Sequence, residues 1–214
     1  MSEQPARKRF QAGGLTKGEQ SIEGLMALGV IVAVLWIIEI FNTIDSNGLD
    51  SDGIYARNIG RIWGILTSPL IHASFQHLTD NTIPFVFMGI FIALRGAKRL
   101  VTVTVLVALL GGLGTWLISP SGVSGHPLST IGASGVVFGY ATYLLTRGVF
   151  DRSLLEVFVG VVVGVVWGSV LIASLVPQQG VSWQAHVCGG VAGVIVAYGL
   201  SERDRRGTTA AATS

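Results

Sequence analysis

The sequence predicts an all-α, polytopic membrane protein that folds as a bundle of six transmembrane helices. Only 12% of its 214 residues are charged and its mean hydropathy is +0.63, whereas a soluble domain has about 25% charged residues. Apolar runs recur along the chain, and polar residues precede every second run. The composition therefore indicates an integral membrane protein, most of whose surface faces lipid.

Three apolar runs are long enough to cross a bilayer, which takes about 20 helical residues. They cover about 24–41, 100–118 and 154–176. The other three are shorter, at about 83–94, 136–145 and 187–200, and follow the polar stretches "HASFQHLTDN", "GHPLSTIGAS" and "QQGVSWQAH". Each reaches full length if its helix begins about two turns earlier. We therefore expect six spans, three of which carry polar side chains into the membrane.

The first run follows a polar stretch that contains "ARKR" and has no small-residue cleavage pattern behind it. This arrangement is typical of a signal anchor. With six spans, most lysines and arginines fall on the side of the N-terminus, and the other side holds only Arg57 and Arg61. The positive-inside rule then places both termini in the cytoplasm. We expect a multi-pass protein of the cell inner membrane, with the lipid bilayer but no nucleic acid as a partner.

One membrane domain, residues 21–201, is expected between a polar N-terminal tail, residues 1–20, and a polar C-terminal tail, residues 202–214. Both tails are expected to lack fixed structure. The connection from about 42 to 68 mixes charged and aromatic residues, among them Tyr55 and Trp63. It suits a segment at headgroup depth, and a solvated loop is the alternative.

The single cysteine, Cys188, excludes an internal disulfide framework. It falls in the sixth span, where we expect it to pack as a small apolar side chain.

The polar residues of the short spans lie at a common depth if these helices all run from outside to inside. In the second span, His77 and Asn81 are four residues apart and share a face, and His72 lies about a turn further out. Ser134 opens the fourth span, and His186 lies near the start of the sixth. Polar residues inside a membrane are costly and usually face the bundle interior or a wet cavity, so all five are candidates for a functional site.

Their chemistry points to acyl transfer. A serine hydroxyl is a weak nucleophile that needs a base, and histidine is the usual base near neutral pH. Gly189 and Gly193 continue the stripe of His186, so close packing of that stripe on the fourth span would bring His186 to Ser134. The developing oxyanion needs hydrogen-bond donors. Candidates are the Ser134 N–H at a helix N-terminus and the side chains of His77 and Asn81.

Each residue alone also has a structural interpretation. Ser134 between glycines is compatible with a helix contact or an N-cap. His77 and Asn81 could form an interhelical hydrogen-bond pair, and His186 could belong to a proton relay. The conjunction of three polar patches at one depth favours the site.

These residues resemble the rhomboid family of intramembrane serine proteases, in its six-helix prokaryotic form. The similarity covers about residues 60–200 and rests on three motifs in the family's order: "HASFQHLTDN", "GASG" and "AHVCGGVAG". It implies that Ser134 is the nucleophile and His186 the base of a dyad. It also implies that His77, Asn81 and the Ser134 N–H line the oxyanion site.

The resemblance assigns supporting positions as well. His72 would support a water-filled cavity, and Gly189 and Gly193 would make a close helix contact. Gly132 and Gly135, on either side of the nucleophile, would leave room for the substrate backbone and the sixth helix.

Several positions depart from the family pattern. Phe138 replaces a common tyrosine four residues after the nucleophile, which keeps the stacking on the histidine but loses the hydroxyl. "GRIWG" supplies Arg61 and Trp63 in the reverse of the usual order, and "GIFIALRGAKRL" lacks a common glutamate. Asp80 stands where an apolar residue is frequent. A structural role is its default interpretation, and tuning of His77 on nearly the same stripe is the alternative.

The resemblance implies a serine endopeptidase that hydrolyses peptide bonds in or near the transmembrane segments of other proteins. Its expected partners are transmembrane protein substrates, which enter between the second and fifth spans below the cap "VPQQGVSW". No cofactor or metal is expected, and the oligomeric state stays open. The alternatives are a catalytically silent rhomboid-like protein that binds transmembrane clients and a proton-coupled transporter.

Overall fold

Helices make up most of the computed structural model, which describes residues 15–123, 126–178 and 180–212. The α-helices, in chain order, are α1 (Lys17–Ile44), α2 (Gly64–Thr67), α3 (Phe75–Ala93), α4 (Ala97–Ile118), α5 (Ser134–Asp151), α6 (Leu154–Ala173) and α7 (Trp183–Ala212). Each of the six predicted apolar runs overlaps one of the six long helices, and the run 154–176 continues beyond the end of α6.

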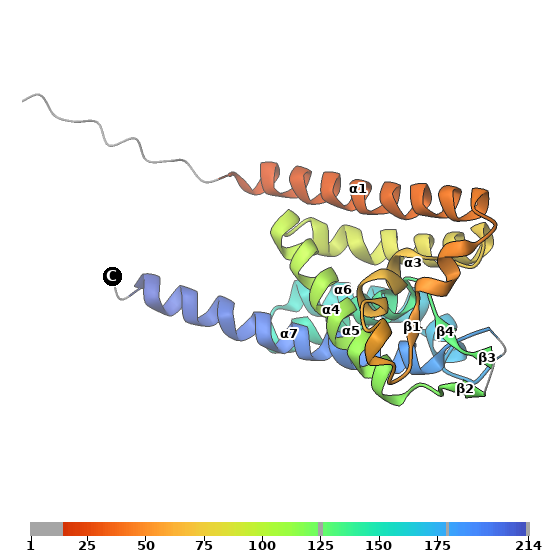
Figure 1. Ribbon diagram of the computed structural model, residues 1–214. Coiled ribbons are helices and arrows are strands. Elements are labelled where there is room, and N and C mark those ends of the chain that lie inside the picture. Colours follow the sequence, from red (N-terminus) through yellow and green to blue (C-terminus); the bar gives the residue numbers. More distant parts are fainter. Residues whose placement is uncertain (1–14, 124–125, 179, 213–214) are drawn as a thin grey trace, which may run out of the picture.

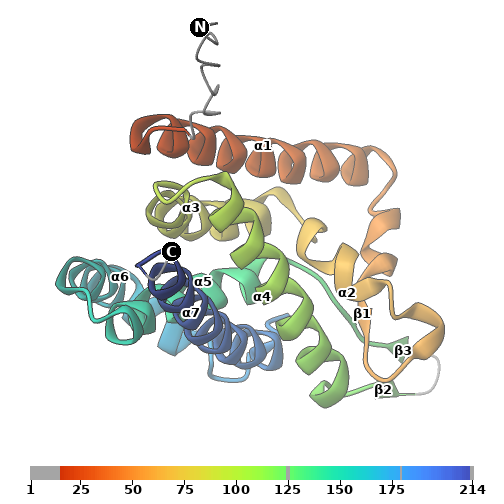
Figure 2. The same cartoon turned by 90° about the vertical axis from the view of Figure 1, so that its left-hand side faces the viewer.

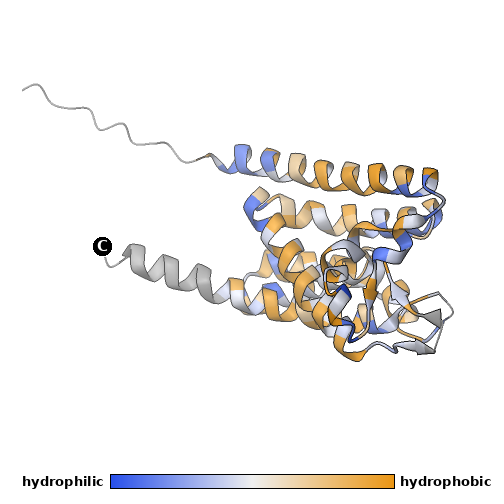
Figure 3. Ribbon diagram, in the orientation of Figure 1, coloured by the Kyte–Doolittle hydropathy of each residue, from blue (hydrophilic) through white to orange (hydrophobic). Residues whose placement is uncertain are grey.

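Four of the described helices are long and apolar enough to cross a membrane, judged by length and composition: α1, α4, α6 and the Trp183–Ser201 part of α7. Apolar residues cover most of the length of the helices (Figure 3). The all-α membrane architecture is therefore supported. The two remaining long helices, α3 and α5, are more polar and are not among these four, so the count of six spans stays a prediction.

Local capping explains where several helices begin. The Thr16 hydroxyl accepts from the Glu19 N–H, and the Glu19 side chain accepts from the Thr16 N–H, which completes a capping box. Helix α1 therefore begins inside the predicted N-terminal tail. The Ser74 hydroxyl caps α3 by accepting from the His77 N–H at 3.1 Å, and Ser153 caps α6 in the same way.

Helix α7 also continues beyond the predicted boundary at residue 201, to Ala212. The stretch "SERDRRGTTAAA" contains no proline and has three Arg and three Ala residues, which favour helix, so nothing in it forces the helix to stop. The remaining tail residues, 1–14 and 213–214, lie outside the described residues, as do the basic residues Arg7, Lys8 and Arg9.

The long helices surround α5. Helix α1 packs along α3 at the top edge of the bundle in Figure 2, α6 lies at its left edge, and α5 runs between α3, α4, α6 and α7. Tyr140 and Tyr143 of α5 are almost fully buried, as are Met88 of α3 and Val103 of α4. The middle of α5 is therefore held by neighbouring helices on several sides.

Short elements cover one end of the bundle, opposite the end where α1 begins and α7 ends (Figure 1). Between α1 and α3 the chain forms 3₁₀ turns at Gly48–Asp52, Ile59–Arg61 and Ser68–Leu70 and a strand, β1 (Ile54–Tyr55). Antiparallel pairing joins β1 to β4 (Ser129–Thr130), and β2 (Gly122–Val123) to β3 (His126–Pro127). None of these strands, each only two residues long, is predicted from the sequence.

The connection before α3 is fixed to the rest of the protein through backbone groups. Arg57 donates to the carbonyl oxygens of Leu117 and Ser119, both at 2.8 Å, at the end of α4. The Arg61 guanidinium lies over the rings of Tyr55 and Trp63. Arg57 and Arg61, the two arginines predicted to lie on the side of the membrane opposite the N-terminus, thus both contact other residues of the protein. The placement of Tyr55 and Trp63 at headgroup depth stays a prediction.

At the opposite end, a buried arginine joins three helices. Arg147 of α5 is 2% exposed, and its Nε lies 2.9 Å from Asp151 and 3.8 Å from Glu156 at the start of α6. Glu156 also pairs with Arg95, which follows α3. Burying such charges is costly unless they are paired, so this cluster fixes the ends of α3, α5 and α6 together.

Candidate functional site

The start of α5 presents its backbone N–H groups without a side-chain cap. Ala133 occupies the N-cap position, and Ser134 is the first helical residue. The first backbone bonds into the helix are those from Val136 and Val137 to the Ala133 carbonyl. The first N–H groups of a helix have no partner inside it and carry partial positive charge. The N–H of Ser134 therefore belongs to a terminus suited to an anion.

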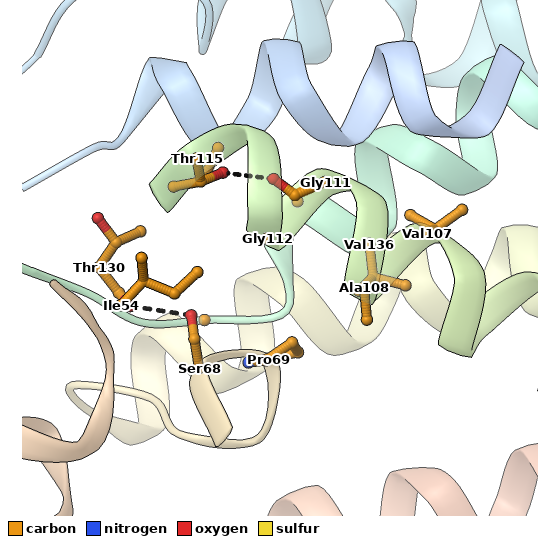
Figure 4. A pocket seen from close by; sticks show the side chains of 13 residues that line it. Ile54, Ser68, Pro69, Val107, Ala108, Gly111, Gly112, Thr115, Thr130 and Val136 are labelled. Carbon is orange, nitrogen blue, oxygen red and sulfur yellow. Dashed lines mark hydrogen bonds between the residues drawn. The ribbon is translucent and has the colours of Figure 1, made fainter. Parts of the chain in front are cut away.

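The loop before Ser134 is held by residues that precede α3. The Gly132 N–H donates to the Ser68 carbonyl at 2.9 Å, and the Ser68 hydroxyl donates to the Thr130 carbonyl at 2.8 Å (Figure 4). One residue later, the Ala133 N–H donates to Nε2 of His72 at 3.2 Å. These bonds fix the backbone that leads into the nucleophile position.

His72 lies in the connection before α3 and is fully buried. Burial lowers the pKa of its ring to about 4, because removing a charge from water disfavours the protonated form. A neutral ring is also what its hydrogen bond needs, since Nε2 can accept from Ala133 only when it carries no proton. His72 therefore acts on the site through the backbone of Ala133.

A small cavity of about 30 Å³ lies behind this loop, between α4, α5 and the residues that precede α3. Its lining includes Gly132, Gly135 and the Ser68 and Thr115 side chains, and Thr115 donates to the Gly111 carbonyl at 2.8 Å (Figure 4). A space of this size can hold a water molecule.

His186 is held in a defined orientation near the start of α7. Its ring is 5% exposed and stacks on Phe138, with centroids 4.3 Å apart and ring planes 8° apart. Its Nδ1 lies 2.8 Å from the carbonyl oxygen of Ser174, at the end of α6. Because a carbonyl only accepts, Nδ1 carries the proton of the neutral ring, and Nε2 is left as an acceptor.

Close contact between α5 and α7 places His186 beside the start of α5. A side chain at Gly189 would overlap the Gly135 carbonyl, and one at Gly193 would overlap the Gly139 carbonyl and the Thr142 hydroxyl. Gly135 itself faces the Ala185 carbonyl, 3.2 Å from where a Cβ would lie. The two helix backbones can approach this closely only because these positions lack side chains.

Cys188 lies on the other side of α7, against α4. Its Sγ would be 2.9 Å from a Cβ placed on Gly114. The expected packing role of this cysteine agrees with that contact.

Ser134 and His186 line the same cavity, of about 880 Å³. No hydrogen bond joins these two described residues directly. Nucleophile and base are often further apart without substrate and move together when it binds. The cavity therefore brings together the two residues from which the sequence predicts a dyad.

His77 and Asn81 converge on Gly132, on the same cavity. Gly132 has a φ of +114°, and a Cβ there would lie 2.8 Å from His77 Nε2 and 3.7 Å from Asn81 Nδ2. His77 Nδ1 accepts from the Ala73 N–H at 3.4 Å, which makes Nε2 the donor of a neutral ring. The Asn81 amide donates one N–H to the His77 carbonyl at 2.9 Å and has a second to offer. Two donors thus face the open space above Gly132.

The cavity continues between α3 and α6. Pro84 of α3 and Trp167, Val170 and Leu171 of α6 line it, and Trp167 also contacts Phe87 of α3 edge to face, with centroids 6.0 Å apart. The lining also includes Pro177, Gln178 and the following residues up to Gln184, with Gln179 outside the described residues. The site is therefore bounded by two helices on one side and by the connection before α7 on another.

Some residues of the site were not anticipated from the sequence. Ser174 contributes a backbone carbonyl, which no side-chain pattern reveals. Ser68 acts through its carbonyl and hydroxyl on a loop more than sixty residues away. A third, Gln76, donates to Asp80 at 2.8 Å, and this i, i+4 spacing is a signal that the sequence does contain.

The assembled groups have the composition needed for acyl transfer. They offer a hydroxyl, an imidazole with a free Nε2, and three N–H donors, from Ser134, His77 and Asn81. Such donors stabilise an oxyanion when they point to the place where it forms.

Comparison with known proteins gives an independent result. The Rhomboid domain profile matches residues 59–203. The chain is 39% identical over 203 residues to an uncharacterized protein of Mycobacterium tuberculosis, covering 94% of this chain and 85% of the relative. An uncharacterized protein of Mycobacterium leprae is 37% identical over 204 residues, 94% of this chain and 76% of the relative. A protein of Acanthamoeba polyphaga mimivirus that is named as a rhomboid protein is 27% identical over 128 residues, 58% of this chain and 67% of its own length.

Proposed function

The chain belongs to the rhomboid family, and from this we propose that it is an intramembrane serine endopeptidase that cleaves transmembrane segments of other proteins with a Ser134–His186 dyad. One observation carries the proposal: Ser134 and His186 line one cavity, and the Ser174 carbonyl holds the ring of His186 with Nε2 free. A rhomboid-like protein that only binds clients needs neither arrangement.

In the first half of the reaction, Nε2 of His186 takes the proton from the Ser134 hydroxyl as its oxygen attacks the scissile carbonyl. Negative charge then develops on the carbonyl oxygen, which accepts hydrogen bonds from the Ser134 N–H, His77 Nε2 and Asn81 Nδ2. Collapse of this intermediate breaks the peptide bond. The leaving amine takes the proton from His186, and an ester joins the substrate to Ser134.

In the second half, a water molecule in the cavity attacks the ester while His186 accepts its proton. The second tetrahedral intermediate uses the same oxyanion donors. When it collapses, Ser134 regains the proton and the carboxylic acid product leaves. The polar lining of the cavity supports this step, because it gives water a favourable environment beside the ester.

The membrane placement is part of the same proposal. Six spans would include α3 and α5, with both termini in the cytoplasm and the cavity open to the outer face of an inner membrane. The substrate would enter between α3 and α6, where Pro84 and Trp167 line the cavity. A helical segment hides its carbonyls in backbone hydrogen bonds, so segments weakened by Gly or Pro should be cleaved best.

The proposal is tested by incubating the purified protein, in proteoliposomes, with a panel of transmembrane substrates that carry Gly or Pro near their outer ends. Wild type should cleave at least one, and Ser134→Ala and His186→Ala should each cleave at least about a thousandfold more slowly. A fluorophosphonate probe should label wild type at Ser134 and leave Ser134→Ala unlabelled. Cleavage by folded Ser134→Ala at the wild-type rate would exclude the dyad. A proton-driven transport assay on the same vesicles tests the transporter alternative.

A further inference from the structure

Asp80 is a charged residue of the cavity that the proposed reaction does not use. It lies on α3 directly before Asn81, its side chain is exposed, and it lines the cavity that also contains Ser134 and His186. A carboxylate on a helix of a membrane domain usually faces a wet cavity and is a candidate for function. Its position beside the reacting groups places Asp80 where it can act on a bound substrate.

The hydrogen bond from Gln76 occupies only part of the accepting capacity of the Asp80 carboxylate. Gln76 Nε2 donates to Oδ1 of Asp80 at 2.8 Å. An ionised carboxylate has two oxygens with about four acceptor sites, and Gln76 is neutral. Within the described part of the chain no Lys or Arg forms an ion pair with Asp80. The carboxylate thus remains able to accept from a cation.

The rest of the lining supplies no positive side chain. Of the described residues around the cavity, none is Lys or Arg, and its second carboxylate, Asp50, accepts from Asn42 at 2.9 Å. The two arginines of the connection before α3 have other partners: Arg57 donates to carbonyl oxygens at the end of α4, and Arg61 lies near Asp52. The charged side chains in the described lining are therefore both negative, which favours a cation beside Asp80.

We propose that Asp80 is a specificity-determining residue, and that it selects transmembrane substrates with a lysine or arginine within about three residues of the cleaved bond. This inference rests on the proposed function. The segment would enter beside α3, and its ammonium or guanidinium group would bind the free oxygen of Asp80. Lys and Arg suit such a place, because their long apolar stems cross lipid while the charged end stays in a polar environment. An acidic residue at the same place would be disfavoured.

The test uses one transmembrane substrate that wild type cleaves, in versions that differ at a single position. Lys, Gln or Glu is placed in turn at each of three positions on either side of the cleaved bond, and kcat/KM is measured in proteoliposomes. At one position or more, wild type should cleave the Lys version about five- to tenfold faster than the Gln version, with Glu slowest. The preference should weaken as salt increases, because the pair is partly exposed.

Asp80→Asn should abolish the preference for Lys, so that the Lys and Gln versions are cleaved at equal rates. Asp80→Lys should reverse the order and favour Glu. The matched control is Asp45→Asn, which removes an exposed carboxylate that does not line the cavity, and it should keep the wild-type preference. Fluorophosphonate labelling of Ser134 should be equal in wild type and in these three variants.

The outcomes separate this inference from the proposed function. If wild type cleaves all versions equally, or if Asp80→Asn keeps the preference, the selectivity role is wrong and the protease stands. If Asp80→Asn lowers cleavage of the Lys and Gln versions by the same factor and shifts the pH profile, Asp80 acts on His77 and not on substrate, which also overturns the inference. Failure of wild type to cleave any substrate or to react with the probe overturns the protease itself.

Discussion

Phe138 stacks on His186, with ring centroids 4.3 Å apart and planes 8° apart. Phe138 lies one turn after Ser134 on α5, so the helix that begins with the proposed nucleophile also supports the proposed base. The Ser174 carbonyl fixes the same ring through Nδ1 at 2.8 Å. Two contacts from two helices thus define both the plane and the tautomer of His186.

The stacking contact leads to a first prediction. Phe138→Leu should lower kcat/KM for a cleaved substrate by about tenfold, since aromatic stacking contributes about 0.5–1.5 kcal/mol and the ring of His186 would be free to turn. Phe138→Tyr keeps the stacking and should stay within about twofold of wild type. The control is Phe158→Leu, an exposed position on α6. Equal activity of Phe138→Leu and wild type would contradict the orienting role.

Gly132 gives a second prediction. Its φ of +114° strains any side chain, and a Cβ would lie 2.8 Å from His77 Nε2, in the space proposed for the oxyanion. Gly132→Ala should therefore reduce kcat by at least about a hundredfold, comparable to the loss of an oxyanion donor. The control is Gly96→Ala, which has a φ of +98° and only ordinary contacts, to Gln20. It should lose stability but keep its activity, and a similar loss of kcat in both variants would assign the effect to backbone strain.

The contact between α5 and α7 gives a third prediction. Gly193→Val places a side chain against the Gly139 carbonyl and Thr142, so the helices must separate. We expect a loss of about 2–3 kcal/mol in unfolding free energy, measured as a lower Tm in detergent. Gly199→Val, on the same helix but with no atom near the added Cβ, should change Tm far less. Equal shifts would show that valine destabilises α7 through helix propensity alone.

A fourth prediction concerns pH. Burial lowers the pKa of His72 to about 4 from 6.5, so the unfolded chain takes up this proton at higher pH than the folded protein. His72 then contributes its full stability above pH 6.5, and the contribution falls as the pH drops from 6.5 to 4, by about 3 kcal/mol at most. His72→Gln keeps an acceptor for the Ala133 N–H without titrating. Between pH 7.5 and 4.5, its Tm should fall less steeply than that of wild type. Parallel curves for the two proteins would contradict a buried, neutral His72.

Much of the helical layout could be predicted from the sequence. Each of the six apolar runs overlaps one of the six long helices, and the extension by about two turns agrees with the start of α3 at Phe75. For the other two short runs the extension was too long, because α5 begins only two residues before its run, at Ser134, and α7 four residues before its run, at Trp183. The two-residue strands and the ends of α1 and α7 could not be predicted in this way. Those features depend on capping and on partners distant in the sequence, such as β4 for β1, and not on hydropathy.

The candidate site, too, was predicted only in part from the sequence. Side-chain chemistry and spacing singled out Ser134, His186, His77 and Asn81, because serine, histidine and asparagine are rare and costly in apolar helices. The groups that orient them are less visible. The Ser174 and Ser68 carbonyls belong to a backbone that every residue shares, and the free side of Asp80 became apparent only with Gln76 and the cavity in place.

The sequence by itself determined that this protein is helical, largely apolar and similar to rhomboid proteases, and it singled out the polar residues that carry the proposed chemistry. Only the tertiary structure decided that Ser134 and His186 line one cavity, that Nε2 of His186 is the free nitrogen, and that His77 and Asn81 meet above Gly132. The physical reason is that hydropathy and spacing act within one helix. The approach of α5 and α7 depends instead on backbone contact between Gly135 and Gly189, more than fifty residues apart.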